Sequence, residues 1–112
     1  MNYSEMKEHE INAAVGEAMG WNAKFIHQDD SVTFRDDLGR LRGRKNYCNS
    51  WADAGPIIQQ NAISVGVRRP GESNEWIASA FLDVFPAVRY RHSNPLRAAM
   101  IVFLMMQEQP NA

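Results

Sequence analysis

The chain has 112 residues, of which 45% are hydrophobic and 22% are charged, and this balance is typical of a single globular domain rather than a disordered chain. Its one cysteine, Cys48, excludes an intramolecular disulfide bond and is typical of a protein from a reducing cytosol. The apolar run at residues 100–106 is much shorter than the ~20 residues that span a bilayer, and no apolar signal-like segment follows the acidic start. We therefore expect a soluble intracellular protein.

Charge is distributed unevenly along the chain, although the net charge is only −1. Residues 1–37 carry three basic and eight acidic side chains, whereas residues 38–97 carry nine basic and four acidic ones. This split indicates either a basic binding face or two parts of one fold that attract each other, and the second interpretation is the simpler. The isoelectric point of about 6.3 argues against a dedicated nucleic-acid domain, for which a value above ~9 is usual.

The sequence predicts a first helix over residues 4–19. Ser4 suits the N-cap, and Gly20 can adopt the left-handed conformation that ends a helix, so that Trp21 folds back. Apolar residues recur at helical spacing, namely Ile11, Ala14, Val15, Ala18 and Met19. This pattern predicts an amphipathic helix with one apolar stripe.

The next part of the chain is less regular. Residues 31–34 alternate and contain two β-branched side chains, which predicts a short strand. Residues 35–45 are charged and interrupted by glycines, and they hold five of the twelve basic residues. We expect them to form an exposed, mobile loop.

A Gly-Pro pair interrupts the helical pattern that begins near Ser50. Pro56 has no N–H, and its ring strains against the carbonyl four residues before it, whereas proline is well tolerated in the first turn of a helix. The sequence therefore predicts a short turn at residues 50–54, a break, and a helix that restarts at Pro56 and ends near Gln60.

Three strands and a last helix follow. Strands are predicted at residues 62–67, 75–82 and 87–92, with a type II turn at residues 69–72. Asn94 followed by Pro95 predicts the start of a helix that ends near Gln107. The order α-β-α-β-β-β-α predicts one α+β domain over residues 1–112, in which helices sandwich an antiparallel sheet of three to four strands.

Three motifs in this order resemble those of a known family. They are Tyr47 with Ser50-Trp51 and Gly55-Pro56-Ile57-Ile58, then Trp76-Ile77-Ala78, and finally Asn94-Pro95-Leu96-Arg97-Ala98-Ala99-Met100. Over about residues 46–104 the chain resembles the NinX-type proteins of lambdoid phages and prophages, which belong to the phage ABA sandwich group. Gln59 departs from the acidic residue of the family pattern. The resemblance implies a small helix–sheet–helix sandwich encoded by a phage or prophage, and it implies no activity.

Groups that could support catalysis do not form a convincing pattern. His27 precedes Asp29 and Asp30, with Asp36 and Asp37 further on, but this spacing on a loop is weak evidence for a metal site. Cys48 with His92 could provide a nucleophile and a base, yet a neutral cysteine is the simpler interpretation. We therefore expect no enzyme, no metal and no cofactor.

Basic side chains offer a candidate binding surface instead. Its residues are Arg40, Arg42, Arg44 and Lys45, with Tyr47 and Trp51 as possible stacking surfaces. Secondary candidates are Arg68, Arg69, Arg89, Arg91 and Arg97. The order α-β-β-β-α after residue 50 is that of a double-stranded-RNA-binding domain, so a small nucleic-acid-binding protein is the alternative. We favour a protein that binds an unidentified host or phage protein.

The last helix carries two apolar stripes. One stripe, through Leu96, Ala99, Met100, Phe103 and Met106, is expected to cover the sheet. The other consists of Ala98, Ile101, Val102 and Met105, and a helix that is apolar all round must be buried all round. The sequence therefore predicts a homodimer through this second stripe. Among the tryptophans, Trp76 is expected in the core and Trp51 over the break in the preceding helix, whereas an exposed Trp21 would mark an interface.

Overall fold

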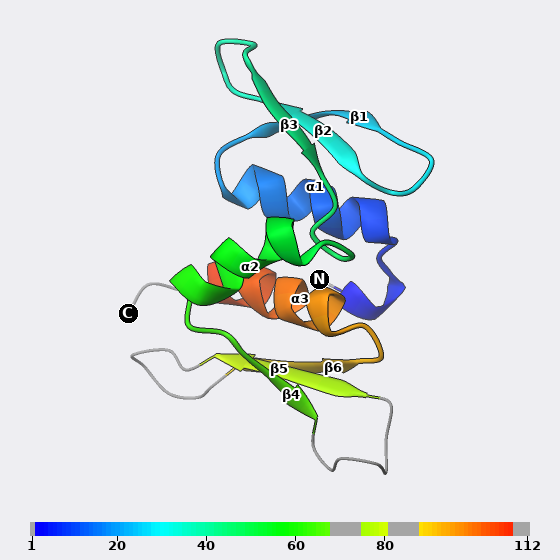
Figure 1. The fold of residues 1–112 in the computed structure, drawn as a ribbon, viewed down its shortest axis with the longest axis vertical. Coiled ribbons are helices and arrows are strands. Elements are labelled where there is room, and N and C mark those ends of the chain that lie inside the picture. Colours follow the sequence, from blue (N-terminus) through cyan, green and yellow to red (C-terminus); the bar gives the residue numbers. More distant parts are fainter. Residues whose placement is uncertain (1, 68–74, 81–87, 109–112) are drawn as a thin grey trace.

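The structure is a computed structural model that describes residues 2–67, 75–80 and 88–108. Its helices lie in a middle layer between two antiparallel sheets (Figure 1). A short 3₁₀ helix precedes the regular elements, which are α1 (Glu8–Ala18), β1 (Asn22–Ile26), β2 (Val32–Arg35), β3 (Leu41–Lys45), α2 (Trp51–Gln60), β4 (Ser64–Val67), β5 (Trp76–Ala80), β6 (Val88–His92) and α3 (Pro95–Glu108). Strands β1-β2-β3 form sheet A and strands β4-β5-β6 form sheet B, each in chain order.

The α+β class and the predicted order of elements are confirmed, with two further strands in the N-terminal half. The predicted single sheet between helices is wrong, because the structure has two three-stranded sheets with the helices between them. Each sheet follows a helix directly, so the chain repeats a helix and a three-stranded meander before α3.

Helix α1 ends as predicted but begins later. The N–H of Gly20 donates to the carbonyl of Glu17 at 3.0 Å and that of Trp21 to the carbonyl of Gly16 at 3.0 Å, while Gly20 has φ +93°. This pattern is a Schellman motif. At the other end the backbone N–H of Lys7 donates to Glu10 Oε1 at 2.8 Å, so Lys7 rather than Ser4 occupies the N-cap position.

The predicted mobile loop at residues 35–45 is wrong, because most of it forms a hairpin between β2 and β3. Val32 pairs with Lys45 and Phe34 pairs with Gly43. Val32 and Phe34 are fully buried on the face of sheet A that packs on α1, as the alternation at residues 31–34 predicted. The pairing of β2 with each neighbouring strand contains an irregularity in register. Among the described residues, no helix covers the other face of the sheet.

The predicted break at Pro56 is also wrong, because α2 is continuous from Trp51 to Gln60. Ser50 caps it, since its Oγ accepts from the N–H of Asp53. Ala52 and Pro56 both lie on the exposed side, so water can solvate the carbonyl of Ala52 that lacks its usual N–H donor. Gly55 has no Cβ to clash with the proline ring, which allows the residue before proline to stay helical.

Sheet B and α3 agree closely with the prediction. Strand β5 lies between β4 and β6, and the buried Val88 alternates with the exposed Arg89. The side chain of Asn94 accepts from the N–H groups of Leu96 at 2.9 Å and Arg97 at 3.2 Å, which confirms the cap. The predicted turn at residues 69–72 lies outside the described residues.

The predicted dimer face on α3 is wrong. Ala98, Ile101 and Val102 are fully buried within one chain, and Met105 is half-buried. Helices α1 and α2 pack on α3 from one side, and β5 and β6 pack on it from the other (Figure 1). The prediction considered only the first helix or a second copy of the chain as cover, and it left out α2, which also packs on α3.

Candidate binding surfaces

The outward face of sheet A presents two rows of side chains to solvent. Register places Phe25 beside Thr33 and Thr33 beside Arg44, and it places Asn22 beside Arg35 and Arg35 beside Leu41. Alternation along β2 turns these rows away from the buried Val32 and Phe34. We call this surface the open face and define it by Asn22, Phe25, His27, Thr33, Arg35, Leu41 and Arg44.

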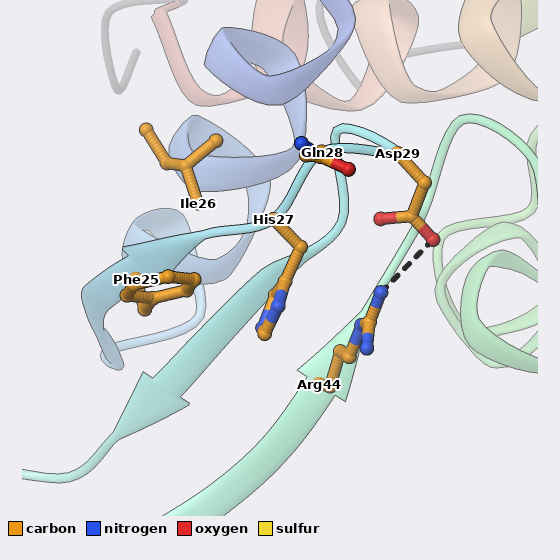
Figure 2. A pocket seen from close by; sticks show the side chains of 6 residues that line it. All are labelled: Phe25, Ile26, His27, Gln28, Asp29 and Arg44. Carbon is orange, nitrogen blue, oxygen red and sulfur yellow. Dashed lines mark hydrogen bonds and ion pairs between the residues drawn. The ribbon is translucent and has the colours of Figure 1, made fainter.

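A hollow of about 490 Å³ lies at the end of the open face near the β1–β2 turn. Phe25, Ile26, His27, Gln28, Asp29 and Arg44 line it. The rings of Phe25 and His27 meet edge to face with centroids 4.8 Å apart, and Arg44 reaches toward Asp29 (Figure 2). The Nε2 atom of His27 lies 2.7 Å from Thr33 Oγ1, which fixes the ring over the sheet.

Asp29 organises the turn beside this hollow. Its Oδ1 accepts from the hydroxyl of Ser31 at 2.5 Å and from the Ser31 N–H at 3.0 Å. Arg44 Nη2 donates to Asp29 Oδ2 at 3.1 Å. These bonds, led by that of the Ser31 hydroxyl, lower the pKa of Asp29 to about 2, so the carboxylate stays charged at neutral pH.

The tip of the β2–β3 hairpin is held by one carboxylate. Asp36 Oδ1 accepts from the N–H groups of Leu38 at 3.0 Å and Arg40 at 2.9 Å, and Asp36 Oδ2 accepts from Arg40 Nε at 2.7 Å. The Arg35 guanidinium closes the turn by donating to the Gly39 carbonyl at 2.8 Å. Hydrogen bonding, chiefly from the Arg40 N–H, lowers the pKa of Asp36. The tip displays Leu38, which is 78% exposed.

The predicted basic residues 40–45 all lie near carboxylates. Arg40 and Arg42 approach Asp36 at 2.7 and 3.8 Å, Arg44 approaches Asp29, and Lys45 Nζ lies 3.8 Å from Asp53 Oδ1. The Arg42 guanidinium also lies over the indole ring of Trp21, 5.7 Å from its centroid. These contacts support the interpretation that opposite charges attract within one fold.

The two aromatic residues of the predicted surface differ. Trp51 is 58% exposed at the first position of α2, although sequence analysis expected it to pack over a break. Tyr47 is 2% exposed and therefore cannot stack on a ligand. Its ring packs on Phe34 with centroids 6.2 Å apart, and burial, assisted by Asp53, raises the pKa of Tyr47 to about 12.

The secondary arginines that the structure describes, Arg89, Arg91 and Arg97, do not form a common surface with residues 40–45. Arg89 and Arg91 are exposed on β6 of the other sheet. Arg97 is buried and donates to the Met6 carbonyl, so it holds the N-terminal segment against α3 and is not available to a ligand. Arg68 and Arg69 lie outside the described residues.

Cys48 and His92 do not form an activated pair. Cys48 is fully buried, and burial, assisted by Glu8, raises the pKa of its thiol to about 12. Burial lowers the pKa of His92, because it disfavours the charged imidazolium. The Nδ1 atom of His92 accepts from the N–H of Asn94 at 2.9 Å. Within residues 2–67, 75–80 and 88–108, no group of three or more histidine, cysteine or carboxylate side chains could hold a metal ion.

One family motif has a structural role, because Asn94 joins a hydrogen-bonded cluster with Cys48 and Asn12. Asn94 Nδ2 donates to the Cys48 carbonyl at 2.7 Å, so the cap of α3 also holds the segment before α2. The buried Asn12 adds α1 to this cluster, because its Oδ1 accepts from the Cys48 N–H at 3.0 Å and its Nδ2 donates to the Asp30 carbonyl at 2.8 Å. Asn94, which belongs to the last of the three motifs, therefore links α3 to the segment before α2.

A family model described as Bacteriophage P22, NinX matches residues 2–107. The chain belongs to the NinX family. The match covers both sheets and all three helices, so the whole fold described above is that of a NinX protein. No curated protein matches the chain. In the part of this NinX chain that the structure describes, no helix has the length and apolarity needed to cross a membrane.

The open face of this NinX protein was not predicted, because no sequence pattern identified β1 and β3. Phe25 and Leu41 are 61% and 62% exposed, and only the register of the strands brings them onto one surface. The signal was present in Thr33 and Arg35, which alternate with the core residues of β2.

Proposed function

We propose that this NinX protein is a non-enzymatic phage accessory protein that binds a host or phage protein in the bacterial cytoplasm. The binding surface in this proposal is the outer face of α2, defined by Trp51, Ala52, Pro56 and Gln59. The observation that carries it is the exposed indole of Trp51, at the end of a helix face that has no charged side chain.

The geometry around Trp51 suits an anchor residue. Asp53 accepts from the N–H of Asn46 at 2.9 Å and lies near Lys45, which fixes the first turn of α2 against the end of β3. A large aromatic side chain on a fixed element loses little conformational freedom on binding, and tryptophan is enriched among residues that dominate binding energy. An uncharged face also has a low desolvation cost.

Binding to nucleic acid receives less support from the geometry. Phosphate binding requires basic side chains that are free to neutralise phosphates and so displace the counterions of the nucleic acid. Here Arg40, Arg42, Arg44 and Lys45 already lie near carboxylates of the same chain. We expect no retention of duplex RNA or DNA by this protein at 50 mM salt. Retention that falls steeply with salt, and less steeply after Arg42→Ala with Arg44→Ala, would favour the alternative.

The test uses tagged protein recovered from phage-infected cells, with co-purified proteins quantified by mass spectrometry. Wild type is compared with Trp51→Ser and with Met19→Ser, which removes another exposed apolar side chain at the end of α1. We expect a protein that wild type and Met19→Ser enrich equally and that Trp51→Ser recovers at least about tenfold less. Equal recovery with Trp51→Ser would exclude the outer face of α2.

A further inference from the structure

His92 is the last residue of β6, from which the chain turns back into α3 (Figure 1). The backbone N–H of Asn94 donates to Nδ1 of His92 at 2.9 Å. A ring nitrogen that accepts a hydrogen bond carries no proton, so the imidazole is neutral here, with its proton on Nε2. Protonation of the ring places a hydrogen on Nδ1, and the bond from Asn94 is then lost.

The residue held by this bond links several elements of the fold. The Asn94 side chain caps α3, and its Nδ2 atom donates to the Cys48 carbonyl at 2.7 Å. The N–H of Cys48 in turn donates to Oδ1 of Asn12 in α1 at 3.0 Å. We call these four residues the Asn94 cluster: Asn12, Cys48, His92 and Asn94. The cluster connects the start of α3 with α1 and with the segment before α2.

The charged groups that act on His92 come from three elements. Burial lowers the pKa of His92 below its ordinary value of 6.5, and the Arg97 guanidinium of α3 lowers it further. Glu8 of α1 and Glu75, next to the start of β5, act in the opposite direction but more weakly. On the segment before α2, the Cys48 thiol stays neutral because its pKa is raised. The imidazole is therefore neutral at pH 7 and becomes charged only in more acidic solution.

The other two histidines have partners that tolerate a charged ring. His9 Nδ1 lies 2.9 Å from Asp30 Oδ1, which accepts from a protonated ring. His27 Nε2 lies 2.7 Å from Thr33 Oγ1, and a hydroxyl can donate or accept. The partner of His92 is a backbone N–H, which can only donate. His92 is thus the histidine whose protonation must break a hydrogen bond of the fold.

We propose that His92 is an acid-sensitive latch: its neutral ring holds the Asn94 cluster together, and its protonated ring releases the start of α3 from the segment before α2. Protonation removes the acceptor of the Asn94 N–H and places a second positive charge near Arg97, which itself holds the Met6 carbonyl. Because the pKa of His92 is lower in the folded protein than in the unfolded chain, the stability that the latch contributes is complete above pH 6.5. It is lost as the pH falls below that value.

Hydrogen exchange of the Asn94 amide tests the latch, because this N–H makes the bond to His92. Rates are measured by NMR from about pH 7.5 to about pH 5 and corrected for the intrinsic effect of pH. Since release is linked to one proton, we expect wild-type protection to fall by up to about tenfold per pH unit below 6.5. In His92→Asn it should stay constant, because the asparagine Oδ1 accepts from the N–H two residues on and does not titrate. The control His27→Asn, in sheet A, should keep the wild-type pH dependence.

His92→Leu provides a second test, since leucine offers no acceptor at any pH. Protection of the Asn94 amide in this variant should be low already at neutral pH and should not fall further in acid. Circular dichroism checks that each variant keeps the fold. An equal pH dependence in wild type and His92→Asn would overturn the proposal, because another group would then be responsible. So would an Asn94 amide that in acid is as protected as the slowest amides of β2, because acid would then act only by unfolding the whole molecule.

Discussion

Gly16 is the residue at which α1 comes closest to sheet A. A Cβ atom at this position would lie 2.1 Å from Cε1 of the buried Phe34 ring. Phe34 also packs on Trp21 and Tyr47, with ring centroids 6.3 and 6.2 Å away, so its ring has little space in which to move. The glycine is therefore required by a close approach rather than by its backbone conformation.

We predict that Gly16→Ala lowers the free energy of unfolding by about 2 kcal/mol, despite the better helix propensity of alanine, because overpacking outweighs that gain. Gly66→Ala is the matched control, since a Cβ at Gly66 meets nothing within 4 Å. It should be neutral or stabilising by up to about 1 kcal/mol. Urea denaturation measures both values, and an unchanged midpoint for Gly16→Ala would contradict the packing described here.

Cys48 provides a second residue-scale prediction. Its thiol is fully buried, with a pKa raised to about 12 from the usual 9.0, so native protein at pH 8 should react with a thiol reagent at least about 100-fold more slowly than unfolded protein. Because the thiol has a higher pKa in the folded protein than in the unfolded chain, its contribution to the free energy of unfolding is complete below pH 9 and is lost as pH rises toward 12. Wild type should therefore lose more stability than Cys48→Ala between pH 9 and 11, which thermal melts can measure. Rapid labelling of the native protein would show that Cys48 is accessible.

At the scale of elements, α2 shows how local sequence can mislead. Pro56 lies at the sixth position of a continuous helix, where it cannot donate to the Ala52 carbonyl. The sequence indicated a break because proline usually ends a helix, but the exposure of Ala52 and Pro56 and the absence of a Cβ at Gly55 reduce the cost of continuing.

We predict that Pro56→Ala stabilises the protein by about 2 kcal/mol, because a helix-interior hydrogen bond is restored. Gly55→Ala should destabilise the wild type, since its Cβ would meet the proline ring, yet it should add about 1 kcal/mol of stability in the Pro56→Ala background. The sign change is the measurement of interest in this double-mutant cycle. Equal effects of Gly55→Ala in both backgrounds would show that the two residues act independently.

The strands show which parts of the fold the sequence determines locally. Strand β6 was predicted because apolar and polar side chains alternate in it, and α3 was predicted because Asn94 and Pro95 mark its start. Strand β3 has the sequence LRGRK, and its only apolar side chain, that of Leu41, faces solvent. Its pairing depends on β2, so no local pattern could identify it, and the open face was missed with it.

At the scale of the whole molecule, α3 is the element on which the layers depend. It packs on sheet B directly and on sheet A through α1, and nine consecutive residues from Leu96 to Leu104 are buried. The apolar character of both its faces indicated burial on both sides, which is correct. The cover comes from the same chain, because α1, α2 and sheet B all converge on it (Figure 1).

This arrangement predicts that the two sheets unfold together. Ile101 is fully buried near the middle of α3, so Ile101→Ala should lower the free energy of unfolding by about 2–5 kcal/mol through lost burial and a residual cavity. Hydrogen exchange of the slowest amides in β2 and in β5 should accelerate by the same factor, because both report global unfolding. Met19→Ala, on the exposed end of α1, should change the free energy of unfolding by no more than about 0.5 kcal/mol, whether it is measured at the amides of β2 or at those of β5. Acceleration confined to β5 would show instead that sheet A with α1 remains folded when α3 and sheet B open, and the molecule would then consist of two separately stable layers.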